Sequence, residues 1–249
     1  MARFLSVRQR QAEWMDEPDA DPRQLRQSLA YIRRINWLMG YDRLIVRYLR
    51  RFSAHWKPGE TIRILDVGTG SADIPQTILH WANRRGLDLR VVGIDLHSKT
   101  IASARETAEV ETRLTVVQGD ALRLPFENDS FDYAVTSMFL HHLDEDDAVR
   151  ALSEMGRVAR RGIIASDLLR LRRSYAFVTL ATLLANPMVR HDARVSIAQA
   201  FSRKEIVALR DQAGIGFARY FQHFVHRFVL AGEKNWDAKM MQKSTGNGR

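Results

Sequence analysis

A carboxylate and two glycines occur together just after a short apolar run in the first third of the chain. The stretch reads Ile-Arg-Ile-Leu-Asp-Val-Gly-Thr-Gly over residues 62–70, with Asp66 two positions before Gly68. Glycine lets the backbone turn sharply and lets a ligand lie close against it. A carboxylate here would repel a pyrophosphate, and Asp73 stands where a dinucleotide fingerprint needs its third glycine. The residues therefore favour a cationic, nucleotide-like ligand.

Two further acidic side chains follow the next apolar runs. Asp95 ends the run at 87–95, 25 residues after Gly70. An acidic side chain at the end of such a strand can accept hydrogen bonds from both hydroxyls of a ribose. Asp120 comes soon after the run at 114–118. The simpler alternatives are a helix N-cap for Asp95 and a solvated loop carboxylate for Asp120.

Histidines supply the candidate proton acceptors. His141 and His142 follow the run that ends at Ser137, and His191 precedes Asp192 after a later apolar segment. Histidine changes charge near neutral pH, so it suits the role of a general base for a phenol, whose pKa is about 10. The alternative for each is a packing or hydrogen-bonding histidine. The chain has no cysteine, and its histidines show no convincing set of metal ligands, so we expect no metal.

Alternating strand and helix patterns must position these side chains. Apolar β-prone runs bounded by turn residues predict strands, and 3.6-residue periodicity with capping signals predicts helices. The strands are expected at 62–67, 87–95, 114–118, 131–137, 162–166, 217–222 and 227–231. The helices are expected at 22–39, 42–56, 74–85, 98–110, 144–159, one or two within 168–189, and 202–213, where Ser202 and Glu205 form a capping box. The order predicts an α/β fold.

The ordered motifs resemble those of the class I S-adenosylmethionine (SAM) dependent methyltransferases, over about residues 62–167. SAM carries an ammonium and a sulfonium group and no phosphate, in keeping with Asp66. The resemblance implies a Rossmann-like, seven-stranded, mostly parallel sheet with helices on both faces and an antiparallel last strand. The cofactor-binding residues that it implies are Asp66, Gly68, Thr69, Gly70, Asp95, Leu96, Gly119, Asp120, Ala121, Ser137 and Met138.

The segment after the fourth predicted strand resembles the small-molecule branch of the family, including ubiquinone- and menaquinone-type methyltransferases. It reads Ser-Met-Phe-Leu-His-His-Leu and lacks the Asn/Asp-Pro-Pro-Tyr/Phe motif that nucleic-acid methyltransferases often carry. We therefore expect methyl transfer to a lipophilic aromatic small molecule, with O-methylation of a phenol as the leading reaction. The alternatives are C-methylation of a quinol-type ring, or a SAM-binding fold that serves as a nucleic-acid-associated or interaction module. The Asp, Asp and Asn of metal-dependent catechol enzymes cannot all be placed.

The chain divides into an N-terminal helical extension or lid at 1–57, a SAM-binding domain at 58–233, and a polar tail at 234–249. The second of these carries a helical insertion on the substrate side at about 168–200. The net charge of +9 comes from 38 Lys and Arg against 29 Asp and Glu, spread along the chain. We interpret it as a solvated basic surface that allows weak membrane-surface association, with no specific nucleic-acid partner.

We expect neither an apolar signal core near the N-terminus nor a membrane span. Residues 1–21 are charged throughout, and the longest uncharged stretch, 174–189, is shorter than the roughly 20 residues that a membrane span needs. We expect a cytoplasmic protein. The residues do not indicate an oligomeric state.

Overall fold

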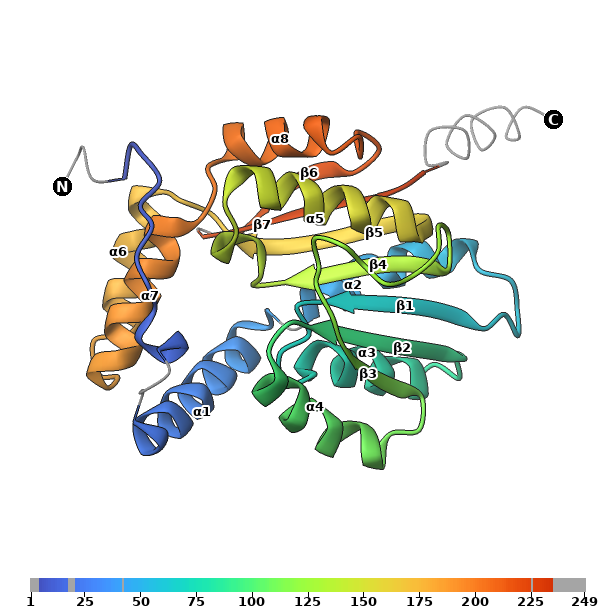
Figure 1. The fold of residues 1–249 in the computed structure, drawn as a ribbon, viewed down its shortest axis with the longest axis horizontal. Helices are drawn as coiled ribbons and strands as arrows, with labels where there is room; N and C mark the ends of the chain where they lie inside the picture. The colour runs from blue at the N-terminus through green and yellow to red at the C-terminus, as the bar shows by residue number, and fades with distance from the viewer. Residues whose placement is uncertain (1–4, 18–20, 42, 225, 235–249) are drawn as a thin grey trace.

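One seven-stranded sheet lies at the centre of the protein (Figure 1). The computed structural model describes residues 5–17, 21–41, 43–224 and 226–234, so most of the expected polar tail lies outside the described residues. The strands are β1 (Ile62–Val67), β2 (Leu89–Asp95), β3 (Leu114–Gln118), β4 (Phe131–Ser137), β5 (Ala159–Leu168), β6 (Arg219–His223) and β7 (Arg227–Glu233).

The strand order is β3-β2-β1-β4-β5-β7-β6. β7 runs antiparallel to β5 and β6, and the pairs formed by β1 to β5 are parallel. The predicted Rossmann-like, mostly parallel sheet is thereby confirmed. The order reverses between β1 and β4, and in open α/β sheets ligands bind outside the carboxyl ends of the strands at such a point.

Helices cover both faces of the sheet (Figure 1). One face carries α2 (Arg43–Phe52), α3 (Asp73–Asn83) and α4 (Ser98–Val110), and the other carries α5 (Glu145–Val158) and α8 (Arg203–Gln212). Each layer closes over its own apolar cluster, so both faces of the central strands are buried. The capping box at the start of α8 is confirmed, because Ser202 and Glu205 exchange both hydrogen bonds.

The N-terminal extension has two different parts. α2 buries one side, including Ile45, Leu49 and Phe52, in the apolar cluster beneath the sheet. It ends at Phe52 and passes into the short helix η2 (Ser53–His55), before the predicted end at residue 56. α1 (Pro22–Met39) instead begins at the end of the molecule formed by α6 (Arg172–Ala181) and α7 (Pro187–Gln199) and packs against α7 (Figure 1).

Hydrogen bonds tie α1 and the first residues to the α6–α7 pair. Tyr31 Oη on α1 donates to the carbonyl of Ala181 at 3.0 Å, and Ser28 exchanges hydrogen bonds with Asn186. Residues 5–17, called the strap below, cross α7 and include the short helix η1 (Trp14–Asp16). None of the helices within the described residues is both long and apolar enough to span a bilayer.

Candidate functional site

The turn after β1 requires glycine for two separate reasons. Gly68 has φ +69° and Gly70 has φ +55°, in the left-handed region that side chains disfavour. A Cβ atom on Gly68 would also lie 2.7 Å from Cδ2 of Phe139. The backbone N–H groups of Gly68 and Thr69 both donate to the carbonyl of Ile94, at 2.9 and 3.0 Å. The turn is therefore held against the end of β2 and the segment after β4.

Asp66 is a buried carboxyl group beneath this turn. Its side chain is 1% exposed, and its Oδ2 accepts a hydrogen bond from Thr69 Oγ1 at 2.8 Å. Burial raises the pKa of Asp66 to about 7, the Thr69 hydrogen bond opposes that rise, and the charge of Asp95 adds to it. A cation nearby would favour the ionised form.

Asp95 fixes the loop after β2 to the glycine turn. Its Oδ2 accepts the backbone N–H of Gly70 at 3.0 Å, and its Oδ1 accepts that of His97 at 3.1 Å. A carboxylate oxygen has more than one lone pair, so these bonds leave capacity for ligand hydroxyls. Leu96, next in the chain, is 58% exposed. The geometry is compatible with the ribose-binding role expected for Asp95.

The loop after β3 joins the same edge. Gly119 donates its backbone N–H to the carbonyl of Asp95 at 2.9 Å. Asp120 is exposed, and its Oδ1 accepts the backbone N–H of Leu122 at 2.8 Å, while Ala121 is partly buried. The structure therefore brings the expected cofactor residues after β1, β2 and β3 to one edge of the sheet.

The segment after β4 adds a strained residue. Met138 has φ +59°, and its N–H donates to the carbonyl of Ser166 at 3.0 Å. Positive φ in a residue other than glycine costs energy and is concentrated at functional sites. Ser137 ends β4 just before it, and the short helix η3 (Leu140–His142) follows. His141 and His142 in η3 therefore lie close in sequence to the edge of the sheet that carries the expected cofactor residues.

His141 forms a buried pair with Asp167 at the end of β5. Its side chain is 2% exposed, and its Nδ1 lies 2.7 Å from Asp167 Oδ1. Burial by itself lowers the pKa of His141, but Asp167, and less strongly Glu13, outweigh it and raise that pKa above its usual range. For Asp167, burial raises the pKa, but His141 and two backbone N–H groups lower it overall.

Glu13 approaches the other side of the His141 ring. Its Oε1 lies 3.8 Å from His141 Nε2, and it also accepts a hydrogen bond from Ser196 Oγ on α7 at 2.6 Å. Glu13 is 6% exposed and belongs to the strap. The imidazole therefore lies between two buried carboxylates that are far apart in the sequence, and the arrangement can hold a proton on either ring nitrogen.

Comparison with known proteins identifies the central domain. A family model described as a methyltransferase domain matches residues 64–162. The demethylmenaquinone methyltransferase of Staphylococcus carnosus is 32% identical over 103 residues, which are 41% of this chain and 41% of that protein. Residues 64–162 belong to the class I SAM-dependent methyltransferase family. The chain spans about two fifths of the length of the curated relatives that it matches.

Solved structures extend the likeness of this methyltransferase fold beyond the matched segment. A SAM-dependent methyltransferase from Aquifex aeolicus has a TM-score of 0.52 at 19% identity, over 69% of this chain and 81% of that chain. The magnesium protoporphyrin IX methyltransferase from Synechocystis with bound SAH has a TM-score of 0.55 at 15% identity, over 78% and 84%. At these identities the likeness concerns the fold, which is the SAM-binding methyltransferase fold.

His142 lies beside His141 in the methyltransferase domain but reaches the surface. The two rings are in contact, with centroids 4.1 Å apart. Loss of water around the ring, and then the neighbouring His141, lower the pKa of His142. Donor atoms of Glu13, His141 and His142 lie within 4.8 Å of one another, a spacing that metal ligands can have. The metal-free site expected from the sequence stays a prediction.

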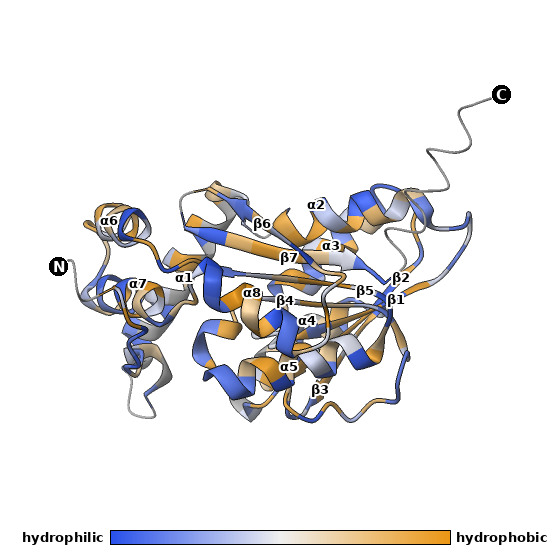
Figure 2. Ribbon diagram, turned by 90° about the horizontal axis from the view of Figure 1, so that it is seen from above, coloured by the Kyte–Doolittle hydropathy of each residue, from blue (hydrophilic) through white to orange (hydrophobic). Residues whose placement is uncertain are grey.

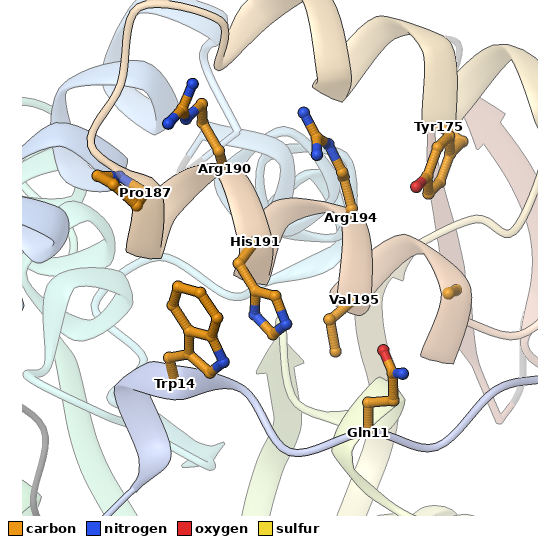
Figure 3. Close-up of a pocket in the computed structure, with 9 residues that line it drawn as sticks. Gln11, Trp14, Tyr175, Pro187, Arg190, His191, Arg194 and Val195 are labelled. Atoms are coloured by element: carbon orange, nitrogen blue, oxygen red, sulfur yellow. The ribbon is translucent and has the colours of Figure 1, made fainter.

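His191 lies in a different environment from the other two candidate bases. On α7 it stacks on Trp14 of the strap, with ring centroids 4.0 Å apart and an interplanar angle of 9°, and its Nδ1 lies 2.8 Å from Asp192 Oδ1. It lines a groove of about 510 Å³ that neither His141 nor His142 lines (Figure 3). The groove residues are Gln11, Trp14, Tyr175, Pro187, Arg190, His191, Arg194, Val195 and Ala198.

Two site residues were missed in the sequence. Asp167 follows the predicted fifth strand, and a polar residue at the carboxyl end of a parallel strand was a usable signal. Glu13 lies in a charged N-terminal stretch whose pattern gives no reason to place it in a buried site. Its position depends on the strap crossing α7, which is a tertiary contact.

Proposed function

We propose that the protein transfers the methyl group of SAM to a phenolic oxygen of a lipophilic aromatic small molecule. The observation that carries this proposal is the buried Asp167–His141 pair, in which His141 follows β4 and the expected cofactor residues Ser137 and Met138. A histidine oriented through Nδ1 by a carboxylate leaves Nε2 to accept a proton. The expected cofactor residues on the neighbouring loops support the same assignment.

In the proposed reaction the phenolic oxygen attacks the methyl carbon in line with the sulfur. The oxygen–carbon bond forms as the carbon–sulfur bond breaks, and sulfur keeps the electron pair. The phenolic proton passes to Nε2 of His141, and the resulting imidazolium lies between Asp167 and Glu13. The residues after β4 supply alignment, which contributes much of the rate in such a displacement.

C-methylation of a quinol-type ring is the second candidate reaction. It is supported by the relatives at 30–35% identity, which are demethylmenaquinone methyltransferases. In that case a ring carbon activated by an ionised hydroxyl attacks the methyl group, and the same histidine takes the hydroxyl proton. The two candidates therefore share a base and differ in the position of the new bond.

Incubation with SAM and a panel of phenols and quinols, followed by mass spectrometry and NMR of the products, tests the proposal. We expect a product one methylene heavier whose new methyl is bonded to oxygen, and a methyl bonded to a ring carbon would favour the second candidate. Asp95→Ala is the matched control, because it is expected to lose SAM affinity while the His141–Asp167 pair remains.

A non-catalytic role would give a different set of results. SAM binding without any product across the panel, together with sub-micromolar and sequence-specific RNA binding, would contradict the enzymatic proposal. We expect instead that the +9 net charge gives weak, sequence-independent binding to nucleic acid that falls steeply with added salt. A gel-shift titration at two salt concentrations measures this.

A further inference from the structure

Three leucines are exposed where α6 leads into α7. Leu180, Leu183 and Leu184 are 72%, 56% and 96% exposed. α6 and α7 lie together at one end of the molecule, with hydrophobic residues on α6 coloured orange (Figures 1 and 2). Single exposed leucines are ordinary, but three within five positions form an apolar patch at the edge of the fold. Hydrogen bonds between α1 and both Ala181 and Asn186 hold this turn in place.

Two arginines lie just beyond the leucines, on α7. Arg190 and Arg194 are one helical turn apart, and their side chains project from the same side of the helix (Figure 3). Neither forms an ion pair with any residue that the structure describes. Arg194 Nε is also buried without a hydrogen-bond partner among those residues. Like charges at this spacing repel each other, and a buried donor without an acceptor costs free energy, so an anion here would offset both.

We propose that Leu180, Leu183, Leu184, Arg190 and Arg194, together the α6–α7 corner, dock on an anionic lipid bilayer. The leucines enter the boundary between headgroups and acyl chains, and the arginines bind lipid phosphates. Apolar residues next to arginines match a bilayer surface, where acyl chains lie beneath anionic headgroups. The net charge of +9 attracts the whole molecule to it.

A second copy of the chain fits this surface less well. In a two-fold symmetric dimer, the corner of one protomer would meet the same corner of its partner, so that unpaired arginines would face arginines. The bilayer instead offers hydrocarbon and phosphate together. The proposal goes beyond methyl transfer, although it would place a lipophilic acceptor in the phase that the protein contacts.

Vesicle co-sedimentation of the full chain tests the proposal without any need for activity. The probes are phosphatidylcholine vesicles and vesicles with about one third phosphatidylglycerol, at physiological ionic strength. We expect the protein to pellet with the second kind and not with the first. Leu184→Asp and Arg190→Glu should each weaken this binding at least tenfold.

The control variants make the same chemical changes on α4. Val110 is 87% exposed and Arg105 is exposed there, so Val110→Asp and Arg105→Glu match the two corner variants in charge. Both controls should bind vesicles nearly as wild type does, and all four variants should show the wild-type circular dichroism spectrum.

Three results would overturn the proposal. One is the absence of wild-type binding to phosphatidylglycerol vesicles, and another is equal weakening by the α4 controls, which would reveal a diffuse charge effect. The third is a dimer in solution that Leu184→Asp dissociates, with no vesicle binding, because the corner would then be an interface between copies. Loss of methyl transfer on all substrates would not affect any of these outcomes.

Discussion

Asp167 contacts His141 through both of its carboxylate oxygens. Oδ1 lies 2.7 Å from the ring Nδ1, and Oδ2 accepts the backbone N–H of the same histidine at 3.0 Å. The end of β5 thereby fixes both the position of η3 and the orientation of the ring. Both residues are nearly inaccessible to solvent, so this interaction is weakly screened.

Asp167→Asn is expected to lower turnover while it leaves SAM affinity nearly unchanged. The amide cannot stabilise an imidazolium as the carboxylate does, so we expect a loss in kcat of about 100-fold. Steady-state kinetics and calorimetric titration with SAM measure the two effects. His191→Ala is the control, because that histidine lies in the groove on α7, and its turnover should stay near wild type.

Equal turnover in wild type and Asp167→Asn would show that the pair is structural and that the reaction needs no base from it. A large loss in His191→Ala with normal turnover in Asp167→Asn would move the base to the α7 groove. A fall in SAM affinity in parallel with turnover would instead indicate damage to the loops after β1 and β2.

The parallel part of the fold was predictable because its signals are local. Apolar runs ending at Val67, Asp95 and Ser137 alternate with helical periodicity, and such alternation leaves few topologies. β5 was predicted too short, because its ends at Ala159 and Leu168 are set by pairing with β4 and β7 rather than by an apolar run. The β-strand propensity of the individual residues does not indicate which strands pair or where the pairing ends.

The surroundings of the candidate base were less predictable because they depend on distant contacts. Asp167 was the last residue of the recognisable motif region, but its partner His141 is 26 positions away. Glu13 reaches the same ring from the N-terminal strap, over a separation that no local pattern encodes. The sequence also did not distinguish His141 from His142 and His191, and burial and hydrogen bonding do.

Turnover should rise with pH over a range that lies above the usual pKa of histidine. Asp167 and Glu13 raise the pKa of His141 despite its burial, and a base must be deprotonated to act. Turnover therefore increases as pH rises through this elevated pKa and levels off above it. Asp167→Asn, assayed for its residual activity, should move this rise to lower pH. If the pH of this rise is unchanged in Asp167→Asn, the rise must reflect the ionisation of another protein group or of the substrate.

SAM affinity should itself increase with pH up to about 7. In the ligand-free protein Asp66 has a pKa of about 7, so it is mostly protonated below that pH. A bound cation favours the carboxylate, so binding at lower pH must release a proton, and affinity falls by up to about tenfold per pH unit. Calorimetry at pH 6 in two buffers of different ionisation enthalpy measures the released proton.

Asp66→Asn provides the comparison for this linkage. The amide cannot ionise, so the variant should bind SAM more weakly at pH 8 and release fewer protons at pH 6 than wild type. Any proton release from SAM itself is common to both proteins and cancels in the difference. Identical proton release in the two proteins would mean that Asp66 does not ionise on binding.

Gly68→Ala and Gly70→Ala separate backbone strain from steric overlap in the turn after β1. Both positions have positive φ, so each alanine should destabilise the fold by roughly 1 kcal/mol. At Gly68 the new Cβ would also lie 2.7 Å from Phe139, whereas at Gly70 no atom lies within 4 Å of it. We therefore expect Gly68→Ala to cost a further 1–3 kcal/mol or so in urea unfolding without ligand.

The double variant Gly68→Ala/Phe139→Ala tests the cause of this additional loss. If the ring of Phe139 obstructs the new methyl group, removing the ring relieves the overlap, and the two single changes are not additive. The double variant should then be more stable than the sum of the separate losses predicts, by about 1 kcal/mol or more. Measurement without SAM is essential, because a side chain at either glycine would also meet a ligand lying against the turn. Equal destabilisation by Gly68→Ala and Gly70→Ala, with strict additivity in the double variant, would show that strain alone makes glycine necessary here.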